Sequence, residues 1–456
     1  MPRLDDLAEK LAPLLGSFLP RQRWFAGHEP PTSVSLTTLD LRDGDPILAW
    51  FLVDAVDAAG GRATYQVVLG GRPAPCELEF LHGKDRVTVG EVDGTVYYDA
   101  LVDPELALTV LDKVAPDESA EVARPLLVEQ SNTSVVYDER LILKMFRRLR
   151  AEPNPDVEIT EVLGEQGFPH VVPQYAALRY EGVDLAVVRQ YMLGSTGAWE
   201  LAHTSLRDLL GTRMPPEEAG ADFGPEAFTL GEVTARLHLA LAEAFGTAPG
   251  EPALWLESFR AQLARVPQGP VEVGDEVVGV RDLIDLDLAA VEAALAALVA
   301  VGDPGSQLRI HGDLHLGQCL MSDRGWLVID FEGEPVRPSG ERLATSSPLR
   351  DVAGMVRSFH YASRTALAER GRDLDPELVD LAGAWEARAT DAYLAGYQHV
   401  EGIDALLPAT KDDRDRVRRA FELDKAVYEV IYELAHRPDW VDIPASAVRR
   451  MLALAG

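Results

Sequence analysis

Acidic and amide side chains gather in one short stretch of the sequence, residues 309–335. Asp313 and Gln318 belong to RIHGDLHLGQ, and Asp330 and Glu332 follow the apolar run WLVI. Phosphoryl transfer needs Mg²⁺ on the phosphates, a cation beside them, and a base that orients the attacking hydroxyl. Mg²⁺ prefers oxygen ligands, usually one or two carboxylates plus phosphates. We therefore predict Asp313 as the base, and Gln318, Asp330 and Glu332 as Mg²⁺ ligands.

The spacing within this stretch is that of a kinase catalytic loop. Residues 311–318 follow the pattern H-x-D-x-x-x-x-N, with Gln318 in place of the asparagine. Asp330 then opens D-F-E, where protein kinases have D-F-G. Both motifs together favour phosphoryl transfer over two unrelated polar loops. His315, inside the loop, is a candidate for the substrate side of the site, where we expect it to support the loop by a hydrogen bond rather than to transfer protons.

A lysine within an apolar strand is the candidate phosphate-binding cation. Lys144 stands in LILKMF, with an apolar residue on each side. A lysine in such a strand is uncommon unless it is paired, and the alternative is an edge-strand lysine that faces solvent. Glu158, on the helix that follows, is the predicted counter-ion, with Asp156 and Glu161 as competing choices.

Two further segments are candidates for nucleotide binding. Ser131 and Ser134 bound a small polar stretch, SNTS, which we place in the turn before the lysine strand. Backbone N–H groups of such a turn can hold phosphates, and no G-x-G-x-x-G motif is present to do so instead. Gln190 and Met192 end the strand AVVRQYM, where backbone groups would hold adenine. The predicted cofactors are ATP and Mg²⁺.

Composition and charge narrow the class of protein. The chain has 456 residues, 47% of them hydrophobic, and a formal net charge of −31. A strongly acidic surface repels nucleic acid and anionic membranes, so we expect neither as a partner. Two distant cysteines, Cys76 and Cys319, do not imply a disulfide framework. The N-terminal residues lack the pattern of a signal peptide, and we expect a cytoplasmic protein, monomeric or weakly dimeric.

Periodicity divides the chain into three parts. β-branched and aromatic strand patterns fill residues 34–100 after an N-terminal helix, and RQRWFAG makes the corner between them, with Trp24 as a core residue. A second strand set has a hairpin signal at Asp138-Glu139, and helical periodicity dominates after about residue 200. We predict an α+β fold with three domains: 1–100, a β-rich cap; 101–200, a small sheet with a helix; and 201–456, a large helical lobe.

Several segments of the sequence resemble the maltokinases. They are EQSNTSVVY, ILKMFRR, NPDVEI, RIHGDLHLGQ, IDFEGEP, SPLRDVAGMVRSF and ELDKAVYE, together with the stretch RQRWFAG. The resemblance implies an ATP-dependent sugar kinase with the bilobal, eukaryotic-protein-kinase-like fold of the aminoglycoside phosphotransferases. It also implies a cap on the N-lobe, Asp313 as base, and Gln318 and Asp330 on Mg²⁺.

The sequence departs from the maltokinase pattern at two places. Only Arg342 precedes SPLRD, where maltokinases tend to carry an Arg-rich turn, and the segment RQYMLGSTGAWE also differs. A related group of maltokinase-like enzymes phosphorylates glucosamine at its 6-hydroxyl. The resemblance therefore leaves two acceptors open: glucosamine, giving glucosamine 6-phosphate, and maltose, giving maltose 1-phosphate. An aminoglycoside acceptor and a non-catalytic pseudokinase are further alternatives.

The acceptor must lie beside Asp313, and a helical segment near the C-terminus offers candidates. Lys425, Glu429 and Glu433 recur every four residues and so share one helical face, either a solvated ion-pair face or part of a sugar pocket. Tyr428 or Trp440 would then supply a stacking wall.

Two charged residues that open another helix are further candidates. Arg350 and Asp351 either have a substrate role or belong to a buried structural ion pair. A carboxylate-rich pocket would favour the cation of glucosamine over maltose, so we predict glucosamine as the small-molecule sugar substrate.

Overall fold

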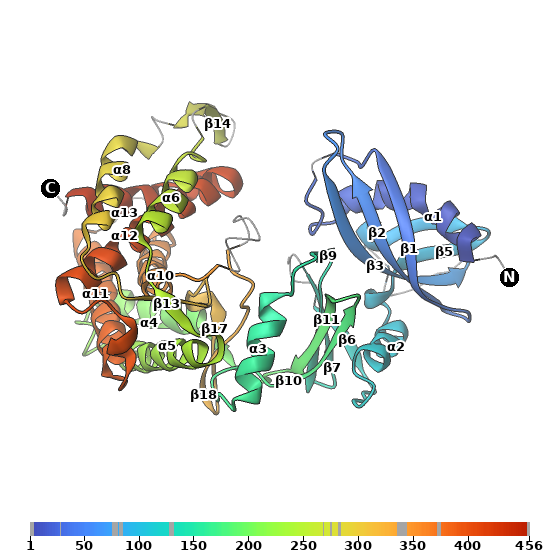
Figure 1. The fold of residues 1–456 in the computed structure, drawn as a ribbon, viewed down its shortest axis with the longest axis horizontal. Helices are drawn as coiled ribbons and strands as arrows, with labels where there is room; N and C mark the ends of the chain where they lie inside the picture. The colour runs from blue at the N-terminus through green and yellow to red at the C-terminus, as the bar shows by residue number, and fades with distance from the viewer. Residues whose placement is uncertain are drawn as a thin grey trace. The chain divides into compact units, whose positions relative to one another are not determined.

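The computed structural model of the chain describes residues 4–27, 29–74, 81, 85–126, 132–267, 269–273, 276–280, 284–334, 344–371 and 375–453. The fold is a mixture of α and β structure, as predicted (Figure 1). Its contacts form two units: unit 1 is Met1–Gly164 with Val172–Leu193, and unit 2 is Glu165–Val171 with Gly194–Gly456. The predicted domain boundaries near residues 100 and 200 remain predictions.

The first part of unit 1 is an antiparallel sheet with a helix packed on it (Figure 1). Leu7, Leu11 and Leu15 recur every four residues, so α1 presents one apolar face, and these side chains join a buried core with strand residues and Trp24. Trp24 is therefore a core residue, as expected. The strand order is β1-β2-β3-β5-β4, with elements α1 (Leu4–Phe18), η1 (Leu19–Arg21), β1 (Ser33–Arg42), β2 (Ile47–Val56), β3 (Arg62–Pro73), η3 (Asp85–Val87), β4 (Thr88–Val92) and β5 (Thr95–Asp99).

The second part of unit 1 is a five-stranded sheet in the order β10-β11-β8-β7-β6. Asp138 and Glu139 both have positive φ, 49° and 51°, which suits a tight hairpin turn, so the predicted hairpin is confirmed. The Asn154 side chain accepts the Asp156 N–H at 2.9 Å and caps α3. The elements are η4 (Ala100–Val102), α2 (Pro104–Val114), β6 (Ala123–Leu126), β7 (Thr133–Tyr137), β8 (Leu141–Met145), β9 (Arg148–Leu149), α3 (Pro155–Glu165), β10 (Gln174–Tyr180) and β11 (Val183–Gln190).

Unit 2 is mainly helical, as periodicity predicted. Two of its long helices, α5 and α11, pack closely, because a Cβ atom on Gly396 would overlap the Phe228 carbonyl oxygen. The helices are α4 (Ala198–Thr212), α5 (Gly224–Phe245), α6 (Pro252–Leu263), α8 (Leu288–Ala296), η5 (Ala297–Ala300), η6 (Leu316–Gln318), α10 (Leu349–Ala368), α11 (Pro376–His399), η7 (Ile403–Leu406), α12 (Lys411–His436), η8 (Pro438–Trp440) and α13 (Asp442–Ala453).

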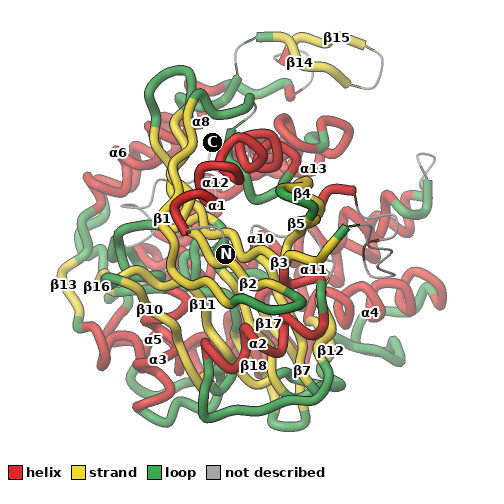
Figure 2. The backbone as a smooth tube through the Cα atoms, turned by 90° about the vertical axis from the view of Figure 1, so that its right-hand side faces the viewer, coloured by secondary structure: helices red, strands yellow, loops and turns green. Residues whose placement is uncertain are grey.

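Short antiparallel sheets complete unit 2. The hairpin of β17 and β18 lies inside residues 309–335, between the predicted base Asp313 and the predicted metal ligand Asp330, and β12 pairs with β17. A separate hairpin, β14 with β15, stands apart from it (Figure 2). Among the described residues, no helix is long and apolar enough to cross a membrane. The strands are β12 (Thr196–Gly197), β13 (Thr247–Pro249), β14 (Pro270–Val273), β15 (Glu276–Gly279), β16 (Ser306–Leu308), β17 (Cys319–Ser322) and β18 (Gly325–Val328).

Candidate active site

A buried aspartate at the start of α10 fixes the backbone that leads to Asp313. The Asp351 carboxylate accepts the His311 N–H at 2.8 Å and the Gly312 N–H at 2.9 Å. The His238 Nε2 atom lies 3.1 Å from the same carboxylate. Burial alone would raise the pKa of Asp351, but the hydrogen bond and charge of His238 and the Gly312 N–H hold it below its usual range. The loop before the predicted base is therefore rigidly held.

The remainder of the loop also rests on α10. A Cβ atom on Gly354 would lie 2.5 Å from the Leu314 carbonyl oxygen, so the helix backbone touches the loop directly. His315 Nδ1 accepts the Gly317 N–H at 3.0 Å, which is the loop-supporting hydrogen bond expected from the sequence. Burial, with a smaller contribution from the Lys425 charge, lowers the pKa of His315, although Asp313 opposes the shift.

Lys425 of α12 bridges the predicted base and a second carboxylate. Its Nζ atom lies 2.8 Å from Asp313 Oδ1 and 2.7 Å from Glu334 Oε1. Burial alone would lower the pKa of Lys425, but the charges of Asp313 and Glu334 outweigh it and raise this pKa. Glu334 was not predicted from the sequence, although it is the third acidic residue of IDFEGEP, two residues after Glu332.

A small cavity that is partly open to solvent lies beside the base. Asp313, Glu334, Arg350 and Lys425 are among the residues that line it. Arg350 Nη2 contacts Glu334 Oε2 at 3.1 Å, whereas Asp351 turns to the loop backbone. Arg350 therefore forms a structural ion pair with the buried Glu334, whereas Arg350 and Asp351 do not pair with each other. The placement of Arg350 on the cavity wall is compatible with a substrate role.

The face of α12 that carries Lys425, Glu429 and Glu433 is buried and paired. Glu429 accepts from Arg357 Nη2 at 2.5 Å, and Glu433 accepts from the Tyr361 hydroxyl at 2.5 Å. The Glu429 side chain is 13% exposed and that of Glu433 is 2% exposed, so the interpretation as a solvated face is wrong. The partners come from α10, which sequence spacing along α12 cannot reveal.

This pairing weakens the electrostatic argument for an amino sugar. Glu429 is neutralised by Arg357, and Glu433 also contacts Arg437 Nη2 at 2.7 Å. An arginine within hydrogen-bonding distance cancels most of the field that a carboxylate exerts on a ligand cation. The expected excess of negative charge on α12 is therefore not present as free carboxylates at Glu429 and Glu433.

The two predicted stacking residues lie in different surroundings. The Lys425 ammonium is 4.6 Å from the ring centre of Tyr428, which is buried, so Tyr428 lies beside a residue of the cavity wall. Trp440 ends η8, is half-buried, and has the Arg437 guanidinium 5.7 Å from its ring centre. A sugar contact by either ring remains a prediction.

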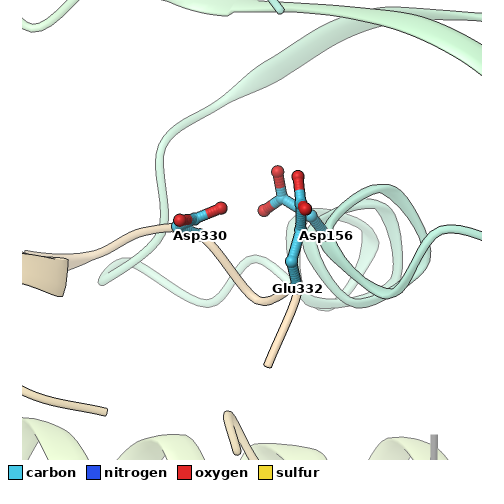
Figure 3. A group of neighbouring side chains, drawn as sticks. All are labelled: Asp156, Asp330 and Glu332. Atoms are coloured by element: carbon cyan, nitrogen blue, oxygen red, sulfur yellow. The ribbon is translucent and has the colours of Figure 1, made fainter. Parts of the chain in front are cut away.

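The predicted metal ligands of unit 2 lie around the loop after β18. Asp330 and Glu332 both belong to this loop. A carboxylate oxygen of Asp330 lies within 4.8 Å of a carboxylate oxygen of Glu332 (Figure 3). Gln318 Nε2 lies 3.3 Å from Asp330 Oδ2. Asp330 has φ of 65°, a left-handed backbone conformation that few residues other than glycine adopt. Two carboxylates beside an amide are the oxygen donors that suit Mg²⁺.

In unit 1, Lys144 is paired with a carboxylate, as expected for a lysine in an apolar strand. The observed partner is Asp156, one of the two alternatives to Glu158. Lys144 Nζ lies 3.1 Å from Asp156 Oδ2, and Arg189 Nη1 lies 2.9 Å from the same oxygen. Asp156 stands in the first turn of α3 (Figure 3). The Glu161 carboxylate instead contacts Arg179 at 2.6 Å. Glu158 as a partner of Lys144 remains a prediction.

The strand position of Lys144 also decides between the two hypotheses for it. β8 lies between β11 and β7 within the sheet, and the Lys144 side chain is 19% exposed. An edge-strand lysine on a solvent face is therefore excluded. The lysine is held by carboxylate while its ammonium keeps some exposure, which suits a contact with phosphates.

The predicted nucleotide contacts Ser134, Gln190 and Met192 lie on or beside the strands of the second sheet. Ser134 lies in β7 opposite Lys144 and is buried, so its placement in a turn is wrong. The Gln190 N–H is donated to the Pro173 carbonyl at 2.9 Å, which removes that group as an adenine donor. The role of Met192 in adenine binding remains a prediction.

Cys319 is a free, buried cysteine. Ser131, Cys76 and Arg342 lie outside the described residues.

Comparison with known proteins identifies the class of this site. Residues 122–418 match the phosphotransferase enzyme family, and residues 18–103 match the maltokinase N-terminal cap domain. The chain belongs to the phosphotransferase enzyme family, and the fold and enzyme class predicted from the sequence are confirmed.

Two relatives of known name are glucosamine kinases. The chain is 31% identical to the glucosamine kinase of Streptacidiphilus jiangxiensis, over 72% of this chain and 73% of that protein. It is 26% identical to the glucosamine kinase of Mycolicibacterium smegmatis, over 74% of this chain and 81% of that protein. A solved glucosamine kinase in complex with glucosamine, ADP and inorganic phosphate is 25% identical, with a TM-score of 0.65, over 92% of this chain and 94% of that one.

Proposed function

We propose that this chain is an ATP-dependent glucosamine kinase that transfers the γ-phosphate to the 6-hydroxyl of glucosamine. The observation that carries the proposal is its similarity to glucosamine kinases, at 31% identity over 72% of the chain. The solved relative that contains glucosamine and ADP supports the use of a nucleotide and a small sugar. The residues required for phosphoryl transfer are present on this chain, which argues against a non-catalytic role.

In this proposal Asp313 accepts the proton of the sugar hydroxyl. Lys425 and the rigid loop hold its carboxylate at one wall of the cavity, where an acceptor hydroxyl can approach. Arg350 and Glu334 are joined across the same wall and would orient the sugar ring through hydrogen bonds. Catalysis then comes mainly from positioning and charge stabilisation, as phosphoryl transfer requires.

In the same proposal, the lysine strand binds the phosphates of the nucleotide and residues 309–335 bind its metal ion. Lys144, fixed by Asp156, would contact phosphate oxygens, and Asp330, Gln318 and Glu332 would hold Mg²⁺. When bound, the metal ion neutralises the charge that develops on the phosphates. Ser131, Ser134, Glu158 and Met192 stay candidate nucleotide contacts, and His315 and Trp440 stay candidates on the sugar side.

Maltose phosphorylation is the second candidate function. It is favoured by the match of residues 18–103 to the maltokinase N-terminal cap domain. The paired carboxylates of α12 also remove one electrostatic reason to prefer an amino sugar. The glucosamine kinase relatives outweigh these points because their similarity extends over most of the chain.

The test is to identify the product. The purified protein is incubated with ATP, Mg²⁺ and glucosamine, and the phosphorylated position is assigned by ³¹P–¹H NMR. We expect a phosphate on O6. The Asp313→Asn variant should bind ADP like the wild type but lose roughly 10²- to 10⁴-fold in kcat, the usual contribution of a general base. A variant with wild-type kcat would contradict the assignment of the base, and a phosphate on another hydroxyl would contradict the assigned position.

A further inference from the structure

The cap sheet and the second sheet of unit 1 share one continuous run of chain. β8 carries Lys144 in the second sheet, and β9 begins at Arg148 and pairs with β3 of the cap sheet. Phe146 and Arg147 alone connect the two strands. A displacement of the cap relative to this connection is therefore passed directly to the strand that positions Lys144.

A buried glutamine of the cap holds the backbone of this connection. Gln66 of β3 donates from Nε2 to the Phe146 carbonyl at 2.5 Å and also to the Leu185 carbonyl of β11. Its backbone N–H donates to the Arg147 carbonyl at 2.9 Å. Trp50 Nε1 donates to Gln66 Oε1 at 3.1 Å, which fixes the orientation of the amide. Gln66 is 0% exposed, so these hydrogen bonds do not compete with water.

The side chain of Arg147 makes a second set of ties. Nη2 donates to Asp99 of cap strand β5 at 2.5 Å, and Nε donates to Thr133 of β7 at 2.8 Å. The guanidinium lies 5.5 Å from the ring centre of Trp24, the aromatic residue of RQRWFAG. The Arg147 side chain is 0% exposed, so its bonds to Asp99 and Thr133 do not compete with water. Arg147 thus links the cap to both strands of the hairpin that contains Lys144.

We propose that the N-terminal cap positions the phosphate-binding lysine, with Gln66, Asp99 and Trp24 acting through Phe146 and Arg147. These are positioning residues, because they act on Lys144 rather than on the nucleotide. The proposal rests on the assignment of Lys144 to the phosphates made above. The Lys144 ammonium lies 5.8 Å from the ring centre of Phe146, so the connection also borders the lysine itself. The cap therefore sets nucleotide affinity and leaves acceptor affinity unchanged.

The test compares two buried aspartates of unit 1. Asp99→Asn removes the charge that faces Arg147, while an asparagine oxygen can still accept the Leu101 N–H. The control is Asp103→Asn, because the Asp103 carboxylate pairs with Arg72 at 3.0 Å and Tyr98 at 2.7 Å, outside the connection. ADP affinity is measured by calorimetry without acceptor, the KM values for ATP and glucosamine by ADP release, and stability by Tm.

We expect both variants to lower Tm and only Asp99→Asn to weaken ADP binding. The expected loss is about tenfold, because a small displacement of a positioned group has effects of this size or larger. The KM for glucosamine should not change. If both variants weaken ADP binding equally, or if neither does, the cap has only a structural role and the proposal is overturned.

Two further variants keep the test decisive. If Asp99→Asn does not fold, Arg147→Lys replaces it, since lysine keeps the charge beside Asp99 but loses the bond to Thr133; unchanged ADP affinity there overturns the proposal. Lys144→Met separates the two assignments. Wild-type ADP affinity in Lys144→Met would contradict the role given to Lys144, whereas weaker binding there with normal binding in Asp99→Asn would contradict the role of the cap alone.

Discussion

Lys425 is the residue through which α12 reaches the base. Its ammonium contacts both Asp313 and Glu334, and the Tyr428 ring lies against it. Without this cation, Arg350 would be the one basic residue left among the described residues that line the cavity, beside the carboxylates of Asp313 and Glu334. Asp313 and Glu334 both contact the same ammonium, so their negative charges would repel each other strongly in this partly buried site if the ammonium were removed. The position of the Asp313 carboxylate therefore depends on Lys425.

Replacement of this lysine separates charge from shape. Lys425→Met should lower kcat by about 100-fold or more, the scale of effect of a misplaced catalytic group, and leave ADP affinity near wild type. Lys425→Arg, which keeps the charge, should recover part of the activity. Steady-state kinetics and ADP calorimetry on the two variants check this. Equal activities of the Met and Arg variants would show that the charge is not needed.

At the scale of elements, packing of helices in unit 2 supports the site. α10 carries Asp351 and Gly354, which hold the catalytic loop, and also Arg357, which holds Glu429 of α12. α11 packs on α5, which carries His238, the neighbour of Asp351. The loop is thus fixed by helix contacts in addition to the hydrogen bond between His315 and Gly317 within it.

Two glycines of α11 test this packing. Gly396→Ala places a methyl group against the Phe228 backbone and should destabilise unit 2 by about 1–3 kcal/mol. Gly383→Ala, on the same helix with nothing within 4 Å of the added atom, should instead stabilise it by up to about 1 kcal/mol. Urea unfolding measures both. Equal effects of the two substitutions would show that α5 and α11 do not approach as described.

Helices, strands and turns could be predicted from the sequence, but the contact partners of individual side chains mostly could not. The hairpin at Asp138-Glu139 and the helical face of Lys425 follow from local patterns, because turn chemistry and periodicity depend on neighbouring residues. The partners of Glu429, Asp351 and Lys144 come from other elements, so spacing alone could not choose among them. Asp156 was already among the choices, but Glu158 lies in the same first turn of α3, so the sequence did not distinguish the two.

At the scale of the whole molecule, buried histidines make stability depend on pH. Burial lowers the pKa of His203 and of His360, with the charges of Arg207 and Arg357 adding to the respective shifts. The unfolded chain then binds more protons than the folded one as pH falls through about 6.5, so acid favours unfolding in this window.

The pH effect is testable with one variant. Between pH 7.5 and pH 5.5 the Tm of the wild type should fall, and it should fall less in His203→Gln, which removes one of these protonation sites. Differential scanning calorimetry at matched ionic strength measures the change. An equal slope of Tm against pH in both proteins would contradict the contribution of His203.

The most direct test of the proposed function is the comparison of acceptors. ADP release is measured with ATP and Mg²⁺ against glucosamine, maltose and glucose separately, and kcat/KM is obtained for each. We predict that glucosamine has a kcat/KM at least about 100-fold above maltose, the discrimination expected when one acceptor satisfies buried polar groups and another does not. Turnover on maltose with little or none on glucosamine would contradict the account and assign the chain to maltose phosphorylation.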